Sequence, residues 1–498
     1  MRSINSPSAL FAIGIAVLLA FAFLGSRGIW DPDEGRYTNA ALNMLETGDW
    51  VHPMRNAYVG HWTKPPLTYW AIAASIGVFG SNPWAARLPS AVAYLACVWL
   101  VWRMARHLLP GRQNEAALIY ATFLLPFGAV QLITTDFLLA AACSAAMACW
   151  IESRFSETTH AGRWLLGMWL CFALAFLIKG PPSLLYLLVI ALCGVLVPGP
   201  RPRAAFHVSG FLLFALAALP WYAIVIRDTP GLLDYYLGVE LIDRLTEPEL
   251  ARHGEWYGWI MIYAPTLLLG TLPWTLDLWR WLLSLGARLR GWRERQARSA
   301  DAAGVILFVW VALPLLVFCL SRSRMPLYLL PLFTPLALIL ARQRQADGRS
   351  FPSLRVLGGW VMLLLILRAA SSYWPTHKNA EAWAAEIRTH VDFPLHKVVF
   401  VEDMARYGLH LHLGVQVEKL SMQPVADRRF DPEYDGNFDA RLEANPLATL
   451  FVCKSERWSE VQAEFGRRGY QTQTLGEEYQ ERVLFKATPT ARMRDPHG

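Results

Sequence analysis

The sequence predicts a polytopic α-helical membrane protein that ends in a soluble α/β domain. Hydrophobic residues make up 54% of the 498-residue chain and charged residues only 17%, whereas a soluble domain carries about 25% charged residues. The apolar residues occur in blocks such as Ala9–Leu24 and Val305–Leu320, which are too long for buried strands and have the length of membrane spans. These observations exclude a soluble enzyme, a disordered protein and a secreted disulfide scaffold.

We expect about 11–13 transmembrane helices within residues 1–373. The stretches that can be placed are 8–24, 84–108, 115–133, 136–152, 163–178, 183–197, 206–226, 258–281, 303–320, 325–342 and 354–373. The apolar run 66–79 is short and begins at a Pro-Pro pair, so we interpret it as an interfacial or re-entrant segment. Two long connections, 25–83 and 227–257, lie between spans.

Basic residues set the predicted orientation, because short cytoplasmic connections of membrane proteins are rich in Lys and Arg. With a cytoplasmic N-terminus, every cytoplasmic segment is basic: Arg2; Arg103, Arg106 and Arg112; Arg154 and Arg163; Arg201 and Arg203; Arg288, Arg290, Arg293, Arg295 and Arg298; Arg342, Arg344, Arg349 and Arg355. The long connections and the C-terminal domain then lie outside the cytoplasm. This pattern accounts for most of the net charge of +7 without a nucleic-acid partner. A cleaved signal peptide at the N-terminus is the alternative, but it would invert this pattern.

Residues 374–498 have the composition of a small α/β domain. The segments 398–405, 415–420, 447–453 and 482–487 are typical of strands, and Asn379–Val391 and Glu456–Gly466 are typical of helices. Cys453 is the only cysteine of this domain, so an internal disulfide is excluded.

The first long connection contains the segment WDPDEGRY, in which acidic and basic residues are closely spaced. Asp33, Arg36 and Tyr37 are spaced i, i+3, i+4 and share a face of any helix that begins near Asp31-Pro32. The alternative is that Asp31 or Asp33 only caps the helix. Four tryptophans in this connection suit a membrane surface.

Charged residues recur at the outer ends of other spans. They are Asp136, Lys179, Arg322 and Arg324, and the connection 227–257 adds Arg244, Arg252 and His253. Each has a structural alternative, because an acid can cap a helix and a long basic side chain can reach lipid headgroups. Charges within spans are costly and usually face a functional cavity, so we expect a shared cavity on the outer face. Cations beside a carboxylate suit a lipid-linked phosphate whose headgroup reacts there.

These motifs resemble those of bacterial GT-C glycosyltransferases, in particular the aminoarabinose transferases of lipid A and, more distantly, protein O-mannosyltransferases. The resemblance covers roughly residues 25–345 and rests on the order of WDPDEGRY, TKPPLTYW, TTDFLL, IKGPP, LPWY, VELIDRL, LPW and SRSRMPLYLLP. Thr63 stands where the family has Glu before Lys-Pro, and Glu240-Leu241 where the aminoarabinose enzymes have Glu-His.

The resemblance implies a GT-C-like fold and assigns roles to individual residues. Asp33 and Asp136 match catalytic acids, Arg36 and Lys64 match donor-phosphate contacts, and Lys179 and Tyr328 match cavity residues. We add Arg322 and Arg324 to the phosphate contacts and Glu34, Tyr37, His61, Arg244 and His253 to the cavity. The implied enzyme is an inverting glycosyltransferase that takes a sugar from undecaprenyl phosphate.

The expected acceptor is lipid A or another envelope glycan in the outer leaflet; the alternatives are a protein acceptor or a transporter of lipid-linked sugars. We expect no metal, no cofactor, no nucleic-acid partner and a monomer surrounded by membrane lipids. The expected location is the bacterial inner membrane, with the active site and residues 374–498 in the periplasm.

Overall fold

The computed structural model describes residues 8–156, 160–197, 205–243, 253–424, 430–442 and 446–490. The chain forms two compact units. The first, here the helical unit, comprises Met1–Leu24, Lys64–Thr68 and Pro89–Ala369; the second, here the sheet unit, comprises Gly25–Thr63, Tyr69–Leu88 and Ala370–Gly498. The predicted boundary at residue 374 falls close to the last segment of the sheet unit. That unit also takes in most of the first long connection, because the connection hydrogen-bonds to residues after 400.

The chain up to residue 372 is helical, and each predicted span contains at least one helix. They are α1 (Ala9–Phe21), α2 (Asp33–Thr47), α3 (Leu67–Phe79), α4 (Pro83–Leu108), α5 (Gln113–Thr122), α6 (Leu124–Ala129), α7 (Asp136–Phe155), α8 (Ala161–Lys179), α9 (Leu185–Leu196), α10 (Val208–Asp228), α11 (Leu232–Asp234), α13 (Gly258–Gly270), α14 (Thr275–Gly291), α15 (Arg295–Ala300), α16 (Ala302–Leu320), α17 (Phe333–Ala346) and α18 (Leu354–Ser372). Short 3₁₀ segments, Pro181–Leu184 and Pro326–Leu332, precede α9 and α17, and a π-helical segment spans Tyr235–Asp243.

Seven helices in the described part of the chain are long and apolar enough to cross a membrane. They are α4, α7, α8, α10, α16, α18 and the continuous stretch Pro326–Ala346, and each coincides with a predicted span. The chain is therefore a multi-pass helical membrane protein, as predicted.

The other four predicted spans are shorter or broken. Helix α1 has 13 residues, and the span predicted at 115–133 divides into α5 and α6 at Phe123, whose backbone is extended. The span predicted at 183–197 consists of the end of a 3₁₀ segment and the 12-residue helix α9. The span predicted at 258–281 bends by 118° between α13 and α14, where Pro273 lacks the N–H that a continuous helix needs. The predicted interfacial segment is the 13-residue helix α3.

The sheet unit contains a six-stranded sheet with the order β3-β2-β1-β4-β6-β5. Its strands are β1 (Lys397–Val401), β2 (Gln416–Ser421), β3 (Gly436–Asn437), β4 (Thr449–Lys454), β5 (Tyr470–Thr474) and β6 (Arg482–Pro489). Strands β3, β2, β1 and β4 are parallel, whereas β6 and β5 pair antiparallel. The four predicted strands are confirmed, and β3 and β5 are additional.

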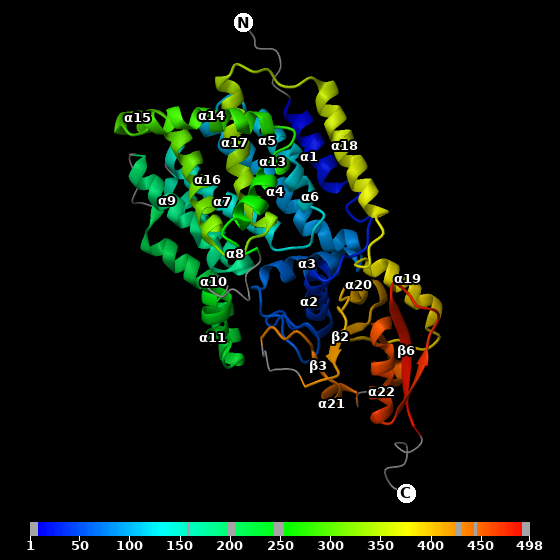
Figure 1. Ribbon diagram of the computed structural model, residues 1–498. Helices are drawn as coiled ribbons and strands as arrows, with labels where there is room; N and C mark the ends of the chain where they lie inside the picture. The colour runs from blue at the N-terminus through cyan, green and yellow to red at the C-terminus, as the bar shows by residue number, and fades with distance from the viewer. Residues whose placement is uncertain are drawn as a thin grey trace. The chain divides into compact units, whose positions relative to one another are not determined.

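Side chains alternate between the two faces of this sheet, as the two-residue period of a strand requires. Val398 and Phe400 pack with α19 (Ala380–His390) on one face. Val399 and Val401 pack with α22 (Trp458–Arg467) on the other face. Figure 1 shows both helices beside the strands. The short helices α20 (Leu409–Leu413) and α21 (Phe438–Arg441) complete this part of the sheet unit.

Candidate active site

Helix α2 presents the predicted catalytic acid at its first turn. The helix begins at Asp33, near the predicted start at Asp31-Pro32, and ends at Thr47. The next residue, Gly48, adopts the left-handed conformation that terminates helices (φ 72°). Arg36 donates from Nη2 to Asp33 Oδ1 at 3.1 Å, and the two side chains are 32% and 72% exposed. Asp33 is thus an accessible carboxylate next to a guanidinium that retains donors for an anion.

The capping alternative is wrong for both aspartates. The N-cap residue is Pro32 and no side chain caps the helix. Asp31 is 1% exposed, and its carboxylate accepts a hydrogen bond from the N–H of Gly408, at 3.1 Å to either oxygen. Burial raises the pKa of Asp31 to about 8 although the Gly408 N–H and the Arg406 charge oppose it.

Glu34, which we predicted as a cavity residue, is buried in a network of ion pairs. It is 3% exposed and its carboxylate accepts from Arg27 at 2.7 and 2.8 Å, from Arg87 at 3.0 Å and from the N–H of Trp30 at 2.9 Å. Burial alone would raise the pKa of Glu34, but the charges of Arg87 and Arg27 outweigh it and hold the pKa at about 2. Glu34 therefore anchors the start of α2, and its neighbour Asp33 remains exposed.

Tyr37 and His61, both predicted as cavity residues, lie next to each other. The Tyr37 ring stacks on Tyr69 with centroids 5.7 Å apart, and His61 contacts both rings edge-on at 6.3 and 5.7 Å. His61 is 4% exposed, so this aromatic group mainly packs α2 against the residues around 61–69.

A second group of predicted residues lies within the helical unit. Asp136 is the first residue of α7 and Lys179 the last residue of α8, and their side chains form an ion pair. Helix dipoles favour an acid at the first position and a base at the last position. Lys179 Nζ also lies 4.5 Å from the centroid of the Tyr328 ring. An ammonium has three donors, so Lys179 retains donors beyond the one that Asp136 accepts.

Arg324 is committed to the backbone, which argues against its predicted role in phosphate binding. It is 4% exposed, and its guanidinium donates to the carbonyls of His253, Glu255 and Cys319. His253 is exposed and contributes its carbonyl to this contact, and its backbone has a φ of 59°. Arg324 thus fixes the segment before α13.

Three predicted site residues, Arg322, Lys64 and Arg244, remain. Arg322 is exposed, and Lys64 is half-buried in the turn before α3. Arg244 lies outside the described residues. Within the described ranges, no group of three or more His, Cys, Asp or Glu side chains is arranged to hold a metal ion.

Sequence reasoning missed a polar contact between α2 and the C-terminal part of the sheet unit. His410 is 2% exposed; its Nδ1 lies 2.8 Å from Asn39 Oδ1 and its Nε2 lies 2.6 Å from Glu46 Oε1. Gln416 donates to Asn43 and to Glu46. Asn39, Asn43 and Glu46 have the i, i+4 or i, i+3 spacing of one helix face, which is the signal that could have indicated a polar interface.

Solved structures of other proteins have a similar fold. The crystal structure of ArnT from Cupriavidus metallidurans bound to undecaprenyl phosphate superposes with a TM-score of 0.72 at 18% identity, covering 96% of this chain and 97% of that one. The apo oligosaccharyltransferase of Archaeoglobus fulgidus gives a TM-score of 0.50 at 11% identity, covering 95% of this chain and 75% of that one. The chain therefore shares its fold with these two solved proteins.

The sequence is also similar to those of known proteins. The family model described as dolichyl-phosphate-mannose-protein mannosyltransferase matches residues 63–226. The undecaprenyl phosphate-alpha-4-amino-4-deoxy-L-arabinose arabinosyl transferase of Edwardsiella ictaluri is 30% identical over 378 residues, which are 72% of this chain and 65% of that relative. A second such transferase, of Proteus mirabilis, is 29% identical over 388 residues, covering 74% of this chain and 67% of the relative. The predicted resemblance to aminoarabinose and O-mannosyl transferases is confirmed, and the chain spans about two thirds of the length of these relatives.

Proposed function

We propose that the chain is a glycosyltransferase of the bacterial inner membrane, which moves a sugar from undecaprenyl phosphate to lipid A or another outer-leaflet glycan. The observation that carries the proposal is the exposed pair of Asp33 and Arg36 at the start of α2. Glu34, the residue next to Asp33, anchors this end of the helix through its buried ion pair with Arg27. The similarity to undecaprenyl phosphate-dependent transferases supports the donor. The basic residues are concentrated in the connections on one side of the membrane, which supports a cytoplasmic location for them and a periplasmic location for the site.

Basic side chains bind the phosphate of the donor in this proposal. In the reaction, the acceptor oxygen forms a bond to the anomeric carbon while the bond from that carbon to the phosphate oxygen breaks. Undecaprenyl phosphate leaves with additional negative charge, which Arg36, Lys64 and Lys179 stabilise. Arg36 offers a planar fork and the lysines offer point charges.

The acceptor decides what Asp33 does. When the acceptor is a hydroxyl, Asp33 accepts its proton as the new bond forms. When it is a phosphate of lipid A, the attacking oxygen is already ionised, and Asp33 instead orients the sugar or the acceptor. Asp136 acts through Lys179, which it holds in place by their ion pair.

Transfer by reconstituted protein tests this assignment. The full chain in proteoliposomes receives undecaprenyl phosphate-4-amino-4-deoxy-L-arabinose, the donor in the names of its relatives, together with lipid A, and the product is measured by mass spectrometry. Asp33→Asn and Lys64→Ala should abolish transfer. Glu456→Gln is the matched control, because Glu456 is a 71% exposed carboxylate in a local ion pair with Lys454. Near-normal turnover of the Asp33 variant refutes the role of this residue.

A protein acceptor is the second candidate, favoured by the match to the mannosyltransferase model. Glycosylated protein in place of modified lipid A, produced with the same dependence on Asp33, identifies it. Movement of labelled donor across the membrane without a covalent product instead identifies a transporter.

A further inference from the structure

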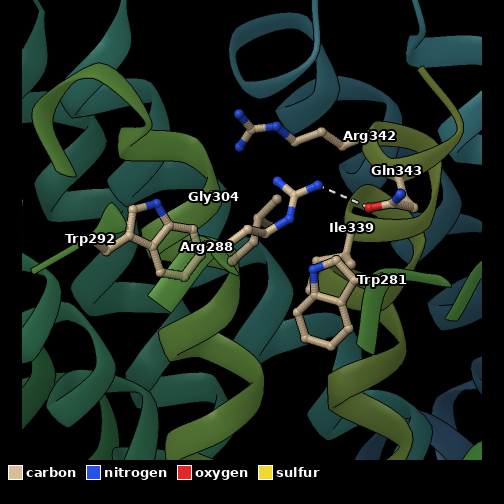
Figure 2. A pocket seen from close by; sticks show the side chains of 8 residues that line it. Trp281, Arg288, Trp292, Gly304, Ile339, Arg342 and Gln343 are labelled. Carbon is tan, nitrogen blue, oxygen red and sulfur yellow. Dashed lines mark hydrogen bonds between the residues drawn. The ribbon is translucent and has the colours of Figure 1, made fainter. Parts of the chain in front are cut away.

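A basic recess lies in the helical unit, and none of the residues proposed for the transfer reaction lines it. It is formed by α14, α16 and α17, and Figure 2 shows the side chains that line it, including Trp281, Arg288, Trp292, Ile339 and Arg342. Two guanidinium groups thus share a recess with two indole rings and an aliphatic side chain. The proposed transfer reaction makes no use of this recess.

The charges of this recess are only partly neutralised. Arg342 Nη2 pairs with Asp301 Oδ1 at 2.5 Å, and the Asp301 carboxylate also accepts from the Trp292 indole and from the N–H of Gly304. Arg288 donates to uncharged partners, Ser284 Oγ at 3.0 Å and Gln343 Oε1 at 2.9 Å. Among the described residues, one carboxylate therefore faces two guanidinium groups, which leaves a net positive charge.

A donor in the recess also lacks a partner. Arg342 Nη1 is buried and has no hydrogen-bond acceptor within the described part of the chain. A buried donor without a partner is unfavourable, and a neighbouring cation adds repulsion. The enclosed space of the recess is about 10 Å³ and admits no more than a water molecule. A larger anion would therefore bind at its opening, beside the partly exposed side chains of Arg288 and Arg342, and would offset their repulsion. A tetrahedral phosphate is suited to this position, because it accepts from several guanidinium N–H groups at once.

The surroundings indicate that this phosphate belongs to a lipid. On α14, Leu282 and Leu283 are 43% and 68% exposed and Leu289 is 41% exposed, which offers an apolar surface beside the recess for acyl chains. Trp281 and Trp292 have the amphipathic rings that are enriched at the boundary between headgroups and acyl chains. A free phosphate would make no use of these side chains.

We propose that this recess binds the phosphate of an anionic glycerophospholipid, with Arg288 and Arg342 as its direct contacts. The site lies on the side of the membrane that the arginine distribution assigns to the cytoplasm. It would bind a structural or regulatory lipid and not the sugar donor, whose phosphate contacts are assigned to other residues.

Native mass spectrometry of the full chain in detergent tests this proposal. The wild type, Arg288→Gln and Arg290→Gln are titrated with phosphatidylglycerol and with phosphatidylethanolamine. Arg290 is the matched control, because it lies on the same helix, is exposed and donates only to the carbonyl of Gly286. The wild type and Arg290→Gln should bind phosphatidylglycerol about tenfold more tightly than phosphatidylethanolamine, and Arg288→Gln should lose this preference.

Other outcomes overturn the proposal. An equal loss in the two variants means that general charge attracts the lipid and that there is no specific site. Displacement of phosphatidylglycerol by millimolar inorganic phosphate means that the recess takes a free anion. If Arg288→Gln does not fold, Arg342→Gln replaces it, since Arg342 is the other proposed contact. Unchanged lipid preference in that variant overturns the proposal.

Discussion

Replacing Glu34 by glutamine tests how the start of α2 is held. The glutamine keeps the shape of the side chain but removes the charge that faces Arg27 and Arg87. Those two arginines are 3% and 0% exposed at the side chain, so water cannot compensate them. Removing one partner of a buried ion pair costs about 3–5 kcal/mol. Three charged hydrogen bonds of 2.7–3.0 Å converge on this carboxylate, so we expect a value within that range.

The neighbouring residue provides the control. Asp33 is 72% exposed, and a substitution at such a surface position changes stability by about 0.5 kcal/mol or less. Glu34→Gln should therefore lower the thermal midpoint of the full chain by roughly 6–20 °C, at about 2–4 °C per kcal/mol for a folding unit of 150–250 residues. Asp33→Asn should leave the midpoint unchanged and remove transfer. The measurement is tryptophan fluorescence of the detergent-purified protein during heating.

The stability that Glu34 contributes also depends on pH. The pKa of Glu34 is lowered from 4.5 to about 2 in the folded protein. Its stabilising contribution is therefore complete above about pH 4.5 and is lost as the pH falls toward 2. Glu34→Gln should lack this part of the acid transition. A midpoint within 2 °C of the wild type, with an unchanged acid transition, would refute the proposed anchor.

Three further predictions concern Asp31, Gly35 and Asp136. The pKa of Asp31 is raised by burial from 3.8 to about 8, so its contribution to stability falls as the pH rises from about 4 to about 8; Asp31→Asn should flatten this pH dependence in thermal unfolding. Gly35→Ala should destabilise the sheet unit, because a Cβ there would overlap the Asp31 carboxylate and lie 2.7 Å from the Gly408 nitrogen; an unchanged midpoint would contradict this close approach. Asp136→Asn leaves the Lys179 ammonium without its carboxylate and should reduce both stability and transfer. The double variant Asp136→Asn, Lys179→Gln should regain stability but not transfer. Recovery of transfer in the double variant would exclude Lys179 from the site.

The sequence predicted those elements whose hydrophobic pattern is local. Strand β1 was predicted because Val398–Val401 form a short continuous apolar run, and helix α22 because its apolar residues follow the helical period. Strand β5, with the sequence YQTQT, lies at the edge of the sheet and is mostly polar, so composition does not distinguish it from a loop. Strand β3 has two residues, which is too short for any periodic signal.

In the candidate site, too, contacts between residues close in sequence were predictable and contacts between distant residues were not. The spacing of Asp33 and Arg36 predicted their pairing, because three residues along a helix bring side chains together. The role of Glu34 depends on Arg87, which is 53 residues away, and that of Asp31 on Gly408, which is 377 residues away. A single sequence contains no periodicity over such distances, so adjacent carboxylates with opposite roles could not be told apart.

The sheet unit is built from segments far apart in the sequence, and this has a consequence for biosynthesis. Its first segment begins at Gly25 and its last at Ala370, so nearly all the helical unit is synthesised between the two. The partners of Asp31 and Asn39, which are Gly408 and His410, leave the ribosome only after these helices. Helix α2 can therefore complete these contacts only after residues 408–410 have been synthesised. A nascent chain arrested before residue 400 should carry an α2 region that proteases cleave, and release of the remaining residues should protect it.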